Sequence, residues 1–78
     1  MRVIDQAIMN RVFDVTDELG ISREAVQVPL LMAGEGVVRS LPGGRFEIEL
    51  PDTDDLDPFL RALPGELAGA GWTGGRRV

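Results

Sequence analysis

The chain has 78 residues, a formal net charge of −5 and 44% hydrophobic residues, which together indicate one folded acidic domain rather than a disordered chain. All 8 basic residues are arginine, and the sequence contains neither cysteine nor histidine. These absences exclude disulfides, thiolate and Schiff-base chemistry, and the commonest general base and zinc ligand. The negative charge argues against a broad nucleic-acid surface.

An amphipathic helix is predicted over residues 3 to 19. Apolar residues recur there at spacings of three and four, which places on one face Ile4, Ile8, Val12, Val15 and Leu19, with Met9 and Phe13 beside them. Gly20 follows directly and suits the left-handed position after a helix. A Schellman motif at this point would give Ile21 an apolar contact.

A strand is predicted after a short turn that runs from Ser22, its expected cap, through Ala25. From residue 26 to residue 32 the period changes to two, as in a strand, where one set of alternate positions holds Val26, Val28, Leu30 and Met32 and the other holds Gln27, Pro29 and Leu31. Pro29 has no N–H to donate to a neighbouring strand, so this strand is expected at the edge of the sheet.

A β-hairpin is predicted from residues 37 to 41 and 45 to 50, joined at Pro42-Gly43-Gly44. A two-residue loop would pair Arg39 with Ile48. A three-residue loop pairs Val38 with Ile48 and Arg39 with Glu47, which matches apolar with apolar and opposite charges with each other. The longer loop is therefore favoured. Three residues are then expected to face the core: Phe46, Ile48 and Leu50.

Asp57 and Pro58 predict a second helix, because an acidic N-cap followed by proline at the first helical position favours a helix start. Its inward stripe consists of four apolar residues, Phe59, Leu60, Leu63 and Leu67. Pro64-Gly65 is expected to break the helix and leave a second short one over residues 64 to 70. Trp72 is expected to close the edge of the core.

These elements predict an α+β fold with an N-terminal helix, a three-stranded antiparallel β-meander and a broken C-terminal helix. Residues 1 to 72 are expected to form a single domain, and residues 73 to 78 a flexible tail. The first residues include no long apolar run, so neither a signal peptide nor a membrane span is expected. The cytoplasm is the expected location.

Four acids lie close together in the sequence: Asp52, Asp54, Asp55 and Asp57. Their spacing lacks the glycine and the closing glutamate of an EF-hand loop, so no metal site is predicted. The acids are interpreted as complementing the positive end of the following helix. Hydroxyl side chains have no histidine or lysine to activate them, so neither a catalytic residue nor a cofactor is predicted, and the chain is not expected to be an enzyme.

Residues 17 to 26, DELGISREAV, resemble the turn of bacterial winged helix-turn-helix regulators, in which a Leu-Gly-Ile-Ser-type turn precedes the recognition helix. Residues 35 to 39 and the hairpin resemble the end of that helix and the wing, so the resemblance covers residues 12 to 50. It implies, as an alternative, a DNA-binding transcriptional regulator. Arg23 and Gln27 would then face the major groove, and Arg39 and Arg45 would contact phosphates.

The residues themselves favour a small acidic non-enzymatic protein–protein interaction or regulatory domain that forms a homodimer or a subunit of a larger assembly. Three apolar residues without an evident core partner are the candidate contacts: Met9, Leu31 and Trp72. A further alternative is an acidic mimic or inhibitor that occupies the basic site of a nucleic-acid-binding protein. No nucleic acid, membrane or small-molecule ligand is expected as a partner.

Overall fold

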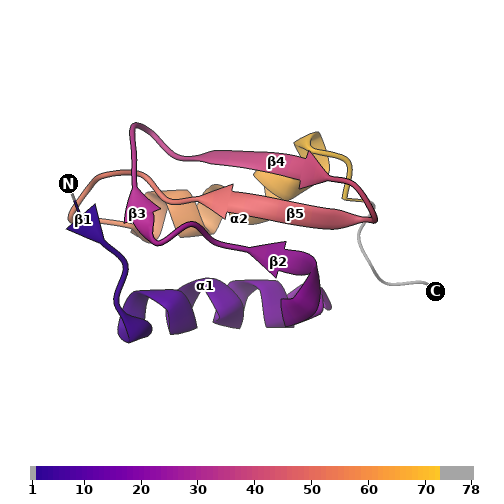
Figure 1. Cartoon of the computed structure of the whole chain (residues 1–78), viewed down its shortest axis with the longest axis horizontal. Coiled ribbons are helices and arrows are strands. Elements are labelled where there is room, and N and C mark those ends of the chain that lie inside the picture. The colour runs from indigo at the N-terminus through magenta and orange to yellow at the C-terminus, as the bar shows by residue number, and fades with distance from the viewer. Residues whose placement is uncertain (1, 73–78) are drawn as a thin grey trace.

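The structure, a computed structural model, describes residues 2 to 72, so the tail predicted for residues 73 to 78 lies outside the described residues. Two helices of 13 residues each, α1 (Gln6–Glu18) and α2 (Asp57–Gly69), accompany a three-stranded sheet. The strands of that sheet lie in the order β2 (Val26–Gln27), β5 (Arg45–Glu49), β4 (Val37–Leu41). A second, two-stranded sheet joins β1 (Arg2–Val3) to β3 (Leu31–Met32) (Figure 1). The predicted α+β class is confirmed.

The first helix begins later than predicted. Asp5 is its N-cap, and one oxygen of the Asp5 carboxylate accepts a hydrogen bond of 2.9 Å from the backbone N–H of Ile8. Val3, which the periodicity places in the helix, belongs instead to β1. Periodicity alone does not locate a helix start, because the capping side chain decides which residue begins the first turn.

The end of α1 forms the predicted Schellman motif. Gly20 has a φ of 79°, a left-handed conformation that favours glycine. The N–H of Gly20 donates to the carbonyl of Asp17 over 3.0 Å, and the N–H of Ile21 donates to that of Thr16 over 2.9 Å. Ile21 is buried, as the motif requires of its apolar contact.

The hairpin of β4 and β5 has the predicted register. Val38 pairs with Ile48 and Arg39 with Glu47, with three residues in the loop. Both loop glycines, Gly43 and Gly44, have positive φ. A one-residue slip would turn the apolar side chains of β5 to solvent, so the register determines which face of the sheet is buried.

The third strand corrects the predicted meander, because β2 runs parallel to β5 and the sheet is mixed. The strand predicted from Val26 to Met32 is divided into β2 and β3, with Pro29 between them. β2 is an edge strand, as predicted. After β2 the chain pairs β3 with β1 and then turns into β4, and a parallel pair requires such a crossover whereas a meander needs only a tight turn.

The C-terminal helix also differs from the prediction, because α2 continues through Pro64 as a single helix. A proline in a helix removes one backbone hydrogen bond. Here one stripe of three leucines, Leu60, Leu63 and Leu67, remains buried in the core. The N-cap is Leu56, so Asp57 and Pro58 are the first two helical residues rather than the cap and the first position.

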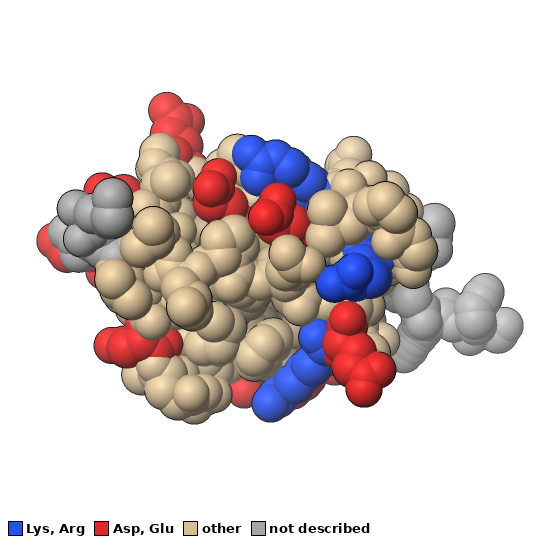
Figure 2. All heavy atoms as spheres, viewed as in Figure 1, with Lys and Arg blue, Asp and Glu red and all other residues tan. Residues whose placement is uncertain are grey.

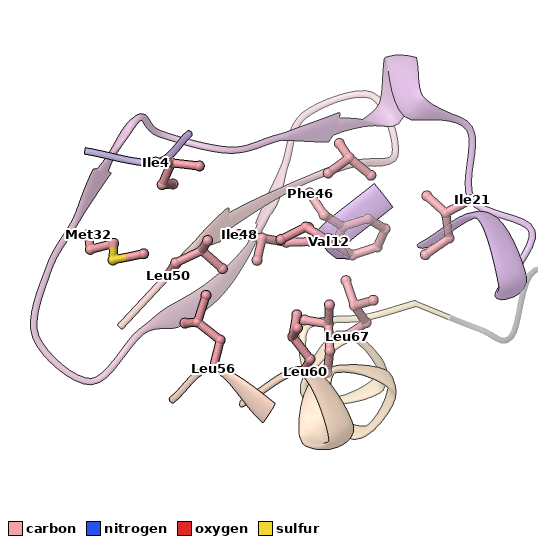
Figure 3. Close-up of a cluster of buried hydrophobic side chains, with 12 residues drawn as sticks. Ile4, Val12, Ile21, Met32, Phe46, Ile48, Leu50, Leu56, Leu60 and Leu67 are labelled. Atoms are coloured by element: carbon pink, nitrogen blue, oxygen red, sulfur yellow. The ribbon is translucent and has the colours of Figure 1, made fainter. Parts of the chain in front are cut away.

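The core lies between one face of the three-stranded sheet and the two helices (Figure 3). The three residues of the β5 region that were predicted to face inward, Phe46, Ile48 and Leu50, are all buried. Val12 of α1 and Leu67 of α2 are fully buried in the same cluster. Both helices therefore cover this one face of the sheet, and the opposite face of β4 and β5 is open to solvent.

Replacing Gly36 with alanine should destabilise the fold more than the same change at Gly43. A Cβ on Gly36 would lie 2.7 Å from a ring carbon of Phe59 and 2.9 Å from Cδ of Pro51, whereas a Cβ on Gly43 meets nothing within 4 Å. Their φ angles are nearly equal, +85° and +84°, so the backbone strain is matched at about 1–2 kcal/mol. Gly36→Ala should cost roughly 1 kcal/mol more in urea unfolding. Equal losses of stability in the two variants would show that Phe59 and Pro51 can move away from a Cβ at position 36 at little cost.

Pro64→Ala should raise the free energy of unfolding by about 1 kcal/mol or more, because alanine restores the N–H that an interior helical position uses. Pro58→Ala is the matched control. Pro58 lies in the first turn, where an N–H has no partner within the helix, so that change should not stabilise the protein. Urea unfolding of both variants provides the comparison. A stability loss in Pro64→Ala would instead show that proline is the better residue at position 64.

Candidate interaction surface

Three large apolar side chains lie exposed at the end of the molecule that carries β1 and β3. Val3 is 66% exposed, Leu30 60% and Leu31 43%. Val3 and Leu31 are cross-strand partners, and the N–H of Ile4 donates to the carbonyl of Leu30 over 2.7 Å. The three residues are therefore neighbours, and we call them the end patch.

The pairing of β1 with β3 explains why the end patch is exposed. Successive side chains of a strand point to opposite faces. Ile4 and Met32 are buried in the core, so Val3 and Leu31 must point outward. The alternation from Val26 to Met32 predicted that Leu30 would also point inward. It is exposed because the strand is interrupted after β2 and Leu30 lies outside both strands.

Only one of the three predicted contact residues belongs to the end patch. Leu31 is exposed there, whereas Met9 and Trp72 are partly buried and pack against the core. Val3 and Leu30 were missed, because the helical periodicity assigned Val3 to a helix and the strand pattern assigned Leu30 to the core. Pairing between distant segments, which the sequence pattern does not specify, is what exposes them.

Exposed acidic residues flank the strands that carry the end patch. Asp5 follows β1 closely, and Glu35 lies in the turn after β3; both are exposed. The N–H of Asp52 donates to the carbonyl of Gly34 over 3.1 Å, which places the acidic loop after β5 beside that turn. Figure 2 shows acidic groups at the rim of this end, while the arginines visible from this side lie over the centre and the opposite end.

The open face of the sheet carries a ladder of opposite charges. Arg39 forms ion pairs with Glu47 at 3.1 Å and Glu49 at 3.7 Å. The guanidinium of Arg45 donates to the side-chain oxygen of Gln27 over 3.0 Å. Exposed ion pairs of this kind contribute about 0.2–1 kcal/mol each, so they organise the face more than they stabilise it.

Arg23 is held by α1. Its guanidinium donates to the Asp17 carboxylate over 2.9 Å and lies 4.9 Å from the ring centroid of Phe13. The hydrogen bond to Asp17 and the charge of that carboxylate raise the pKa of Arg23. Residues 23 to 25 form a single 3-10 turn that leads directly into β2, at the place where the winged-helix resemblance implies a recognition helix. All four residues implied to contact DNA therefore have partners within the domain.

The acid cluster before α2 is engaged locally. The N–H of Asp57 donates to the Asp55 carboxylate over 3.1 Å, and the N–H of Asp55 donates to the hydroxyl of Thr53 over 3.3 Å. The carboxylate of Asp57 pairs with Arg11, which ties α2 to α1. Across residues 2 to 72, no three acidic side chains are grouped closely enough to hold a metal ion.

Within the part of the chain that the structure describes, neither helix has the length and apolar character needed to cross a bilayer. No known protein family matches this chain, and no curated protein and no solved structure shows significant similarity to it.

The winged-helix alternative can be tested by electrophoretic mobility shift. Arg23, Arg39 and Arg45 already contact side chains of the domain, and phosphate binding would have to displace those contacts on a chain of charge −5. We therefore expect no retardation of duplex DNA even at low salt, where electrostatic binding is strongest. Sequence-specific retardation that is lost in Arg23→Ala would contradict this expectation and support the regulator.

Proposed function

We propose that the protein is a small non-enzymatic interaction or regulatory domain, acting through the end patch in a complex with a second copy or with another protein. The supporting observation is that three aliphatic side chains from neighbouring backbone segments, Val3, Leu30 and Leu31, are exposed, and that within residues 2 to 72 Val37 is the other large apolar residue that is exposed. Apolar residues gathered in one place on a soluble domain mark interaction sites more often than isolated ones do.

The energy available from the end patch sets the kind of complex to expect. Complete burial of one valine or leucine side chain contributes about 1.5–3 kcal/mol, so this partly exposed set contributes on the order of 4 kcal/mol. Association itself costs about 4–15 kcal/mol in lost freedom of motion. The end patch alone therefore supports only a weak complex, and a stable one needs polar or charged contacts around it.

The composition supports a non-enzymatic role. The sequence has no histidine, cysteine or lysine, so the usual activated nucleophiles and general bases are lacking. The most elaborate polar arrangement on the open face of the sheet is the ladder around Arg39, whose guanidinium is paired with two carboxylates. Such mutual pairing organises a surface and leaves little charge for activating a substrate.

Leu31→Asp should abolish the complex without unfolding the domain. Leu31 is 43% exposed, so an aspartate there remains partly hydrated, while in a complex its charge would be buried against apolar groups. Ala62→Asp is the matched control, since Ala62 is exposed on α2 and receives the same charge. Co-purification from source cells and sedimentation velocity should show a stoichiometric complex for the wild type and Ala62→Asp, and a monomer for Leu31→Asp.

Two results would contradict the proposal. The first is a wild-type chain that has no stoichiometric partner and stays strictly monomeric at about 1 mM, the concentration at which a complex with a net binding free energy of about 4 kcal/mol is detectable. The second is a Leu31→Asp variant that keeps the complex. Urea unfolding of both variants with wild-type midpoints would show that any loss of the complex is local to the surface.

A further inference from the structure

We infer that the end patch recognises a protein segment in which apolar side chains are flanked by lysine or arginine. This inference rests on the proposed function and adds the chemistry of the partner. The geometry combines an apolar centre, formed by Val3, Leu30 and Leu31, with a rim of exposed carboxylates that includes Asp5 and Glu35. Such a surface is complementary to a basic segment, because its apolar centre can bury apolar side chains while its carboxylates face lysine or arginine.

The charge at this end of the molecule is one-sided. Residues 30 to 38, which contain β3 and its flanking turns, include one acid, Glu35, and no basic residue. Residues 50 to 56, the acidic loop between β5 and α2, include three acids, Asp52, Asp54 and Asp55, and again no basic residue. Arg2, at the start of β1, is the one arginine among residues 2 to 10. Together with Asp5, the segments that meet here thus include five acids and one arginine.

The fold holds these segments together. The N–H of Ala33 donates to the carbonyl of Leu50 over 3.0 Å, so the end of β3 is tied to the end of β5. Gly36 packs so closely on Pro51 and Phe59 that a Cβ there would overlap both. The turn that carries Glu35 is consequently fixed against the acidic loop, and its charge stays beside the end patch.

The same charge argues against a second copy as the occupant. Two copies joined through their end patches would bring both acidic rims together on chains that each carry a net charge of −5. Like charges across an interface oppose association, whereas lysine and arginine can cover apolar surface with their stems and place their charges on the rim. The carboxylates of the rim therefore favour binding of a basic segment and oppose binding of a second copy.

Salt dependence separates the two occupants. Screening weakens attraction to a basic segment, but it relieves repulsion between two acidic copies. Between about 0.1 M and about 1 M salt the Debye length falls from about 10 Å to about 3 Å, so both effects are large at the rim. Binding of a basic segment should weaken with salt, and self-association through the end patch should strengthen.

The test is an NMR titration of the full ¹⁵N-labelled chain with a synthetic peptide, Lys-Lys-Val-Leu-Val-Leu-Lys-Lys, and with a matched peptide in which glutamates replace the lysines. We expect amide shifts at Val3, Leu30 and Leu31 with the lysine peptide, and affinity at least about fivefold lower at high salt and for the glutamate peptide. Equal affinity for the two peptides, or shifts confined to other elements, would overturn the inference.

Glu35→Lys provides the matching change in the protein. It should weaken binding of the lysine peptide several-fold and strengthen that of the glutamate peptide, because it reverses one charge of the rim. Glu66→Lys is the control, since Glu66 is an exposed acid on α2 and the change in net charge is the same. Equal effects of the two variants would show that net charge, and not the rim, governs binding, and would also overturn the inference.

Failure of this inference can be distinguished from failure of the proposed function. If the lysine peptide does not bind, but the labelled chain alone shows concentration-dependent shifts at Val3, Leu30 and Leu31 that grow with salt, the occupant is a second copy. That result overturns the basic partner and leaves the interaction function standing. If the peptide does not bind and Leu31→Asp also leaves the cellular complex intact, both proposals are overturned.

Discussion

The central strand β5 is the constraint on which the rest of the structure depends. Its inward side chains are buried in the core, and a three-residue loop fixes its register with β4. Its other edge pairs with β2. Because side chains alternate along a strand, burying Phe46 and Ile48 forces Glu47 and Glu49 to the open face, where they pair with Arg39. Both helices are then confined to the apolar side of the sheet.

The end patch is a by-product of how the chain completes this small core. A domain of this size has little interior, and Ile4, which follows β1, and Met32 of β3 extend it. The same pairing turns Val3 and Leu31 outward. The pairing of β1 with β3 thus both stabilises the core and exposes the end patch. A partner would bury the apolar side chains that folding leaves exposed.

Much of the fold was predictable because local patterns determine it. The hairpin register followed from matching charges and apolar residues across the loop, and the end of α1 followed from Gly20 and Ile21. The errors occurred where distant segments compete with a local pattern. Pro64 is a strong local signal against a helix, yet α2 continues through it, because the helix buries one stripe of leucines against the sheet.

The sequence by itself determined the α+β class, the hairpin, the inward face of β5 and the acidic, arginine-only composition, since each depends on residues that are neighbours in the chain or on counting. Only the tertiary structure decided that β2 is parallel to β5, that β1 pairs with β3, and that Val3 and Leu30 are exposed beside Leu31. The physical reason is that a strand's pattern specifies which side is buried but not which distant strand it meets, and the candidate surface arises from that pairing.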